Sequence, residues 1–147
     1  CLLQCEAVLR GWISGDATAL YNEGVAASMK QWGIYSGITV PDDDAIQAYL
    51  DANPFDESYE MIGEQLYLTL WRSFGEVFSN WRRLGYPVLV PVNYPNNVTG
   101  GVIPRRIPYY GLGTTNIGVL ENWENYQAAV QRQGPDNYLT RVWWDTE

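Results

Sequence analysis

The chain has 147 residues, of which 46% are hydrophobic and 18% are charged, so it suits about one globular domain and is too apolar for a disordered tail. Nine Lys and Arg residues against 17 Asp and Glu residues give a net charge of −8, which repels phosphate backbones and disfavours a nucleic-acid partner. The longest apolar stretch, residues 86–92, contains two prolines and is far shorter than the roughly 20 residues of a membrane span.

The sequence contains no histidine, which removes the commonest general base and the commonest metal ligand. We therefore expect no catalytic residues, no metal site and no cofactor. Seven Trp and 11 Tyr residues instead supply rings that can pack in a core or stack on a ligand.

Two helices are predicted first, over residues 2–14 and 16–31, with Asp16 as the cap of the second. Gly24 and Ala27 are small enough to let another helix approach, so the pair resembles one tetratricopeptide-like hairpin. Such hairpins stack to bury their faces, and no second copy is recognisable in the sequence. Either the stacking partners lie upstream or the later helices replace them, and we expect the isolated chain to associate or to be marginally stable.

The start of the chain indicates a piece of a larger protein. It lacks Met, a signal peptide and a helix N-cap. Cys1 and Cys5 are four residues apart, unlike the Cys-x-x-Cys spacing of redox and zinc sites, so we interpret both as small packing groups.

The acidic run Asp42-Asp43-Asp44 precedes a short predicted helix over residues 43–52. Carboxylates at a helix N-terminus are favoured electrostatically, so capping is the preferred interpretation. A calcium site is the alternative, although the alternating oxygen ligands and the Gly of an EF-hand loop are missing.

A long helix pair is predicted over residues 58–83, interrupted around Gly75. Arg82 and Arg83 occupy its last turn, and Gly85 and Pro87 end it. Residues four apart form an apolar face that we expect to be core rather than a ligand stripe: Ile62, Leu66, Leu70, Phe74, Phe78, Val77 and Trp81.

Prolines and paired glycines exclude regular helix from about residue 87 to residue 108, and residues 103–110 are expected to be extended. Arg105 and Arg106 could face an anionic ligand, but pairing with carboxylates of the same chain is the preferred interpretation. The triplet Asn97-Val98-Thr99 matches a glycosylation acceptor, a pattern that also arises by chance.

A last helix is predicted over residues 117–133, ending at Gly134-Pro135. Its first turns carry Glu121 and Glu124. Carboxylates near a helix N-terminus are favoured electrostatically, and we prefer this interpretation to a catalytic pair of acid and base. The final residues are expected to be extended, so that Trp143 and Trp144 point to opposite sides, one to pack and one to stack on a sugar ring.

Several motifs, in this order, resemble the carboxyl-terminal part of the SusD/RagB family of nutrient-binding lipoproteins of Bacteroidota. They are AVLRGW at residues 7–12, GDA at 15–17, YNEGV at 21–25, Gln65, Leu70, Gly75 and Glu76, WRRLGYP at 81–87, IPRRIPY at 103–109, NYQAA at 125–129, and RVWWD at 141–145. The chain departs from the family pattern at Tyr67, Leu84 and residues 71–74. These departures leave the fold expectation unchanged.

The resemblance implies an all-α, tetratricopeptide-like fold in which residues 1–147 are one carboxyl-terminal portion of a longer SusD-like domain. It also implies an outward-facing outer-membrane lipoprotein, anchored through an upstream Cys outside this chain. Such proteins of starch utilisation systems capture glycans or other nutrients without chemistry and pass them to a SusC-like TonB-dependent outer-membrane transporter. The matched motifs look architectural, so no ligand-binding residue is assigned.

Two other functions remain open at this point. A glycan-active hydrolase could use a carboxylate pair such as Glu121 with Glu124 or Asp43 with Asp56, although no pattern in the sequence marks a pocket that would raise a carboxyl pKa. A plain helical interaction module is the third possibility.

Overall fold

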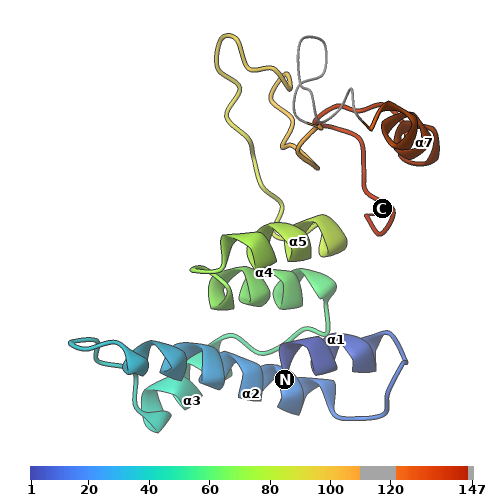
Figure 1. The fold of residues 1–147 in the computed structure, drawn as a ribbon. Coiled ribbons are helices and arrows are strands. Elements are labelled where there is room, and N and C mark those ends of the chain that lie inside the picture. The colour runs from blue at the N-terminus through green and yellow to red at the C-terminus, as the bar shows by residue number, and fades with distance from the viewer. Residues whose placement is uncertain (110–121, 146–147) are drawn as a thin grey trace. The chain divides into compact units, whose positions relative to one another are not determined.

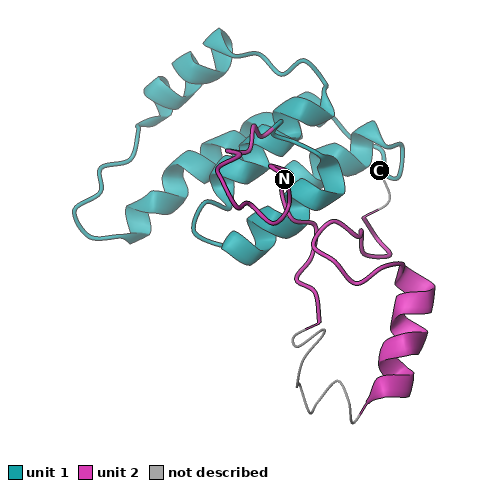
Figure 2. Cartoon of the chain, turned by 90° about the horizontal axis from the view of Figure 1, so that it is seen from above, with its two compact units in different colours: residues 1–88 teal, residues 89–147 magenta. Residues whose placement is uncertain are grey.

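The structure is a computed structural model that describes residues 1–109 and 122–145, and it divides into two compact units (Figures 1 and 2). Unit 1 spans Cys1–Val88 and unit 2 spans Leu89–Glu147. The described residues form helices and irregular segments and contain no strand. The predicted all-α class is therefore confirmed.

Unit 1 contains every helix that the sequence predicts before residue 88, together with one short 3-10 helix that it does not predict. The elements are α1 (Leu2–Leu9), α2 (Ala17–Lys30), the 3-10 helix η1 (Gln31–Ile34), α3 (Asp43–Ala52), α4 (Tyr59–Thr69) and α5 (Phe74–Leu84).

Three of these helices begin at the residues that the sequence predicts as caps. The side chains of Asp16, Asp42 and Ser58 accept hydrogen bonds from backbone N–H groups three residues later, at 2.9, 2.8 and 3.1 Å. These bonds satisfy donors that have no partner within the helix. The capping interpretation of the acidic run is confirmed.

The helices of unit 1 form two hairpins, α1 with α2 and α4 with α5, and the two helices of each hairpin run antiparallel (Figure 1). Helix α4 contacts both α1 and α2, while α3 contacts α2. The second hairpin thus takes the place of a repeat that the sequence does not reveal, and it buries one face of the first. This arrangement confirms the tetratricopeptide-like expectation.

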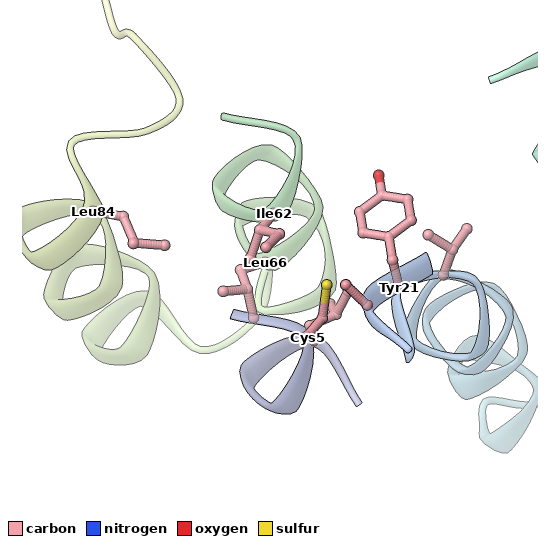
Figure 3. Packing of buried hydrophobic residues seen from close by; sticks show 8 residues of the cluster. Cys5, Tyr21, Ile62, Leu66 and Leu84 are labelled. Carbon is pink, nitrogen blue, oxygen red and sulfur yellow. The ribbon is translucent and has the colours of Figure 1, made fainter. Parts of the chain in front are cut away.

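The core of unit 1 lies where the two hairpins meet, with side chains from α1, α2, α4 and α5 gathered there (Figure 3). Tyr21 stacks on Phe55 with ring centroids 4.2 Å apart. Cys5 is fully buried, as a packing group should be, whereas Cys1 is exposed and does not fill that role. The buried members are Leu2, Cys5, Ala17, Tyr21, Val25, Ile62, Leu66 and Leu84.

Gly24 is the point of closest approach between α1 and α2. A Cβ atom added there would lie 2.6 Å from the Leu2 side chain. Close approach at Gly24 is therefore confirmed. Ala27 is exposed, so the expectation of a closely approaching helix is wrong for this residue.

The N-terminal helix is shorter than predicted. Helix α1 ends at Leu9, because Gly11 has a φ of +70°, which helical backbone does not adopt. Ile13, which the predicted helix would place on its apolar face, is exposed, and so is Trp12.

The break in the central helix pair also differs from the expectation. It falls at residues 70–73, and Gly75 lies inside α5. Ile62 and Leu66 are buried, but Phe74 is 75% exposed, because the break rotates the two halves of the pattern out of register. Trp81 is half-buried, and its Nε1 donates to the carbonyl of Pro87 at 3.2 Å. The end of α5 is as predicted, with Gly85 left-handed at a φ of 76°.

Glu6 of α1 links the two hairpins through a buried carboxylate. Arg83 of α5 binds it with both terminal nitrogens, and Arg10 Nε donates to it at 2.8 Å. Burial by itself raises the pKa of Glu6, but the bonds from Arg83 and Arg10 outweigh it, and the pKa is lowered from its ordinary value of 4.5. The pair joins residues that are 77 positions apart.

Unit 2 is mostly irregular, with one described helix, α7 (Trp123–Gln133), which ends at Gly134 as predicted. Residues 89–108 contain no helix, which confirms the effect expected of the prolines. The predicted start of the last helix and Glu121 lie outside the described residues.

The two adjacent arginines of unit 2 pair with carboxylates of the same unit. Arg105 Nε donates to Asp145 at 2.8 Å, and Arg106 donates to Asp136 at 3.0 Å. Arg141 also donates to Asp145, at 2.8 Å. The preferred interpretation of Arg105 and Arg106 is confirmed, because both guanidinium groups are engaged internally.

Candidate functional site

A cleft with aromatic walls opens on unit 1, where α2, η1, α3 and α4 meet. We call it the aromatic cleft; its cavity measures about 520 Å³, within the range of small-molecule sites. Trp71 and Tyr49, on its walls, are 56% and 42% exposed. The lining residues are Ser28, Met29, Trp32, Pro41, Tyr49, Gln65, Leu68 and Trp71.

A second, smaller cavity of about 280 Å³ shares Trp32 with the aromatic cleft. The guanidinium of Arg72 lies over the Tyr35 ring, 4.7 Å from its centroid, and the Trp32 and Tyr35 centroids are 6.0 Å apart. The lining residues are Gln31, Trp32, Ile34, Tyr35, Thr69, Leu70, Arg72 and Ser73.

Local backbone structure explains why these rings face outward. Helix α4 ends at Thr69, and the turn that follows is closed by Trp71 N–H donating to Leu68 O at 3.3 Å. On α3, Ile46 faces the protein and is buried, which leaves Tyr49, three residues later, at the edge of that face and half in solvent. Gln31 Nε2 donates to Thr69 O at 3.0 Å and so ties η1 to the end of α4.

Ser28 and Gln65 are polar residues that line the aromatic cleft, and neither is charged. The hydroxyl of Thr69 lies 2.9 Å from Ser28 Oγ and 2.7 Å from Gln65 O. Gln65 itself is buried, with 7% of its surface exposed. Aromatic walls over neutral hydrogen-bonding groups suit a neutral ring-shaped ligand better than an ion.

Asp43 and Asp56, considered as a catalytic pair, both have a lowered pKa and so are not prepared as a general acid. Asp43 pairs with Lys30 and Asp56 accepts from Ser58 N at 2.9 Å, and these partners lower the pKa of each carboxyl. A general acid needs a raised pKa. Glu124 is exposed on α7, and its suggested partner Glu121 lies outside the described residues. Residues 1–109 and 122–145 hold no group of three metal-binding side chains.

One of the two final tryptophans is exposed and the other is half-buried, as expected, but the backbone that carries them is not extended. Trp143 is 83% exposed while Trp144 is half-buried. The segment turns instead of extending, with Asp145 N–H donating to Val142 O at 2.9 Å. Trp143 lines neither of the two cavities described above.

Sequence reasoning left the binding residues unknown and missed the aromatic cleft, because its lining comes from four elements that only the fold brings together. One signal was present. Residues 71–74 depart from the family pattern, and they supply Trp71 to the cleft and Arg72 to the smaller cavity.

The fold of unit 1, two stacked helical hairpins, defines an all-helical protein of the tetratricopeptide-like class. The sequence model of the SusD-like family, described as starch-binding and associating with the outer membrane, matches residues 1–110. The chain belongs to the SusD-like family. This membership confirms the predicted family and supports the predicted outer-membrane location.

Solved structures of longer proteins share this fold. One named a chitin-binding protein is 40% identical, with a TM-score of 0.88 over 99% of this chain and 32% of its own. A SusD-like protein of Bacteroidetes AC2a is 27% identical, with a TM-score of 0.79 over 100% of this chain and 29% of its own. A SusD homologue from Bacteroides fragilis is 26% identical, with a TM-score of 0.81 over 99% and 34%.

The chain therefore spans about a third of the length of these similar proteins. No protein of curated function matches it. Within the described part of the chain, no helix has the length and apolar character needed to cross a bilayer.

Proposed function

We propose that the full protein captures a carbohydrate, in the first place an oligosaccharide, at the outer face of the outer membrane and releases it unchanged. The observation that carries this proposal is the family match over residues 1–110, whose description names starch binding and the outer membrane. A similar structure that is 40% identical is named a chitin-binding protein. The nutrient class follows from these names.

The chemistry of the helical unit supports a neutral ligand. Exposed rings in a cleft stack on the apolar faces of sugars, and neutral amide and hydroxyl groups bond their hydroxyls. The net charge of −8 repels anionic ligands at long range. An uncharged glycan is not repelled by this net charge, and it needs no ion pair in order to bind.

Binding without turnover is part of the proposal. Catalysis of glycoside hydrolysis needs one carboxyl with a raised pKa and one ionised carboxylate at a fixed separation. The pKa values of Asp43 and Asp56 are lowered by their hydrogen-bonding partners, so neither is prepared to donate a proton. The family's members bind nutrients without altering them.

The remaining steps of the proposal concern the rest of the protein. An upstream Cys carries a lipid anchor, and the bound glycan passes to a SusC-like TonB-dependent transporter in the same membrane. A covalent lipid would hold the protein at the membrane surface.

Isothermal titration of the full-length protein against chitooligosaccharides, maltooligosaccharides and other neutral glycans tests the capture step. We expect saturable binding of at least one glycan, no new reducing ends after prolonged incubation, and co-purification of a barrel protein from outer membranes. Cleavage that is lost in Asp56→Asn would contradict capture without chemistry. The absence of any barrel partner would remove the delivery step.

A further inference from the structure

We propose that the aromatic cleft of unit 1 is itself a carbohydrate site, which holds one neutral sugar ring against Trp71 and Tyr49 and bonds its hydroxyls through Gln65. This inference rests on the proposed function, because it names where the glycan binds.

The first support is the state of the rings. Trp71 and Tyr49 are 56% and 42% exposed, yet both line a cavity of about 520 Å³. Large aromatic side chains that keep open faces inside a concave surface provide a platform on which a sugar ring can stack. Trp12, an exposed ring elsewhere in unit 1, lines neither of the two cavities.

The second support is independent and comes from a buried polar group. Gln65 is 7% exposed and lines the cleft, and no atom of its side-chain amide is both fully buried and without a hydrogen-bond partner. The amide oxygen accepts and the amide nitrogen donates hydrogen bonds, which are the two kinds of bond that a sugar hydroxyl makes. A ligand hydroxyl in the cleft could bond to this amide, whereas an apolar side chain from another segment could not.

The third support is charge. The lining of the aromatic cleft contains no charged residue on a chain with a net charge of −8. Arg72 lines only the smaller cavity, where its guanidinium lies over Tyr35. An acidic or basic ligand would find no countercharge in the cleft, and an uncharged sugar would need none.

The test uses the full-length protein and the neutral oligosaccharide that binds it most tightly among chitohexaose and maltohexaose. Trp71→Ala removes the stacking ring, and Gln65→Leu keeps the side-chain size while removing the amide. Trp12→Ala is the matched control, since Trp12 is 70% exposed in the same unit but outside the cleft. We expect titration calorimetry to show about tenfold weaker binding for Trp71→Ala and several-fold for Gln65→Leu, with Trp12→Ala unchanged.

A measurement on the unmodified protein does not depend on how the variants fold. Hydroxyl-radical footprinting with and without saturating oligosaccharide should show protection of Trp71 and Tyr49 but not of Trp12. If both cleft variants bind the oligosaccharide as tightly as the wild type, and the ligand does not protect Trp71 and Tyr49, the cleft assignment is wrong. The proposed capture function would still stand. If Trp71 does not react with hydroxyl radicals even without ligand, and Trp71→Ala lowers the melting temperature, then upstream chain covers the cleft and the cleft assignment is wrong. A wild-type protein that binds neither sugar would end both proposals.

Discussion

The two units of this chain are stabilised in different ways. Unit 1 buries eight hydrophobic residues between two helical hairpins, so its stability comes mainly from apolar surface removed from water. In the described part of unit 2 the buried residues are Arg106 and Asp145, both charged. Charge-assisted hydrogen bonds therefore stabilise unit 2, whereas apolar side-chain packing stabilises unit 1.

This difference shows how one chain can combine a rigid scaffold with a long irregular segment. Packed helices hold the aromatic cleft in unit 1, because each element that lines it also contributes to or contacts the hairpins. Unit 2 fixes a proline-rich backbone, which cannot form helix, by attaching its arginines to carboxylates that follow 30 and 40 residues later.

The largest expected effect is on the core of unit 1. Ile62→Ala should lower the free energy of unfolding by about 4 kcal/mol, because the side chain is fully buried and its removal leaves a cavity. Ile107→Ala makes the same change at an 86% exposed position of unit 2 and should stay within about 0.5 kcal/mol. Chemical denaturation of the full-length protein measures both. Equal losses of unfolding free energy in the two variants would contradict the claim that the two units are stabilised in different ways.

The second effect tests the ion pairs of unit 2. Asp145→Asn should cost about 3 kcal/mol, because it leaves Arg105 and Arg141 without the buried carboxylate that both contact. Hydrogen exchange should show the loss in residues 103–109 and 138–145, with α4 unaffected. Asp43→Asn, the same change at an exposed pair with Lys30, is the control and should have no measurable effect. Loosening of unit 1 by Asp145→Asn would be the contrary result.

The two units should also respond differently to acid. Burial raises the pKa of Asp145, but hydrogen bonds from Arg105 and Arg141 outweigh it and lower the pKa below the ordinary 3.8. A lowered carboxyl pKa contributes stability that is present above the unfolded value and is lost as pH falls through the folded value. Exchange protection in unit 2 should therefore fall below about pH 4, whereas unit 1 loses the Glu6 linkage in acid but keeps its buried apolar core. Simultaneous loss in both units would argue against separate stabilisation.

A smaller effect is expected at two helical glycines. Gly24→Ala should cost about 1–2 kcal/mol, because the new methyl group would lie 2.6 Å from Leu2 and its strain exceeds the gain in helix propensity. Gly75→Ala, with nothing within 4 Å of the added atom, should stabilise α5 by about 0.5 kcal/mol. Thermal unfolding of the two variants decides whether the α1 and α2 contact is as close as described.

Local signals in the sequence were enough for most of the helices. Asp16, Asp42 and Ser58 mark helix starts and Gly85 and Gly134 mark ends, because each depends on a hydrogen bond or a backbone angle within a few residues. The end of α1 was missed, since the apolar residues Trp12 and Ile13 continue the pattern past Gly11 although both are exposed. Apolar character alone does not report which side of a helix will be covered.

The candidate site was beyond sequence reasoning for a related reason. Its rings lie on η1, α3 and the turn after α4, and periodicity relates residues only within one element. The sequence suggested that one of Trp143 and Trp144 would be free to stack. Trp143 is the exposed one, but it lines neither of the two cavities described above. The pairing of Arg105 and Arg106 could be anticipated from the excess of carboxylates, though not the identity of the partners.

The proposal that a neutral glycan is captured by rings and uncharged polar groups is tested most directly by salt. Titration of the full-length protein with its tightest neutral oligosaccharide should give dissociation constants that differ by less than about twofold between about 0.05 M and about 0.5 M salt, because stacking and neutral hydrogen bonds are not screened. A weakening of about tenfold or more at the higher salt concentration would mean that the ligand is held by charge, and would contradict neutral glycan capture.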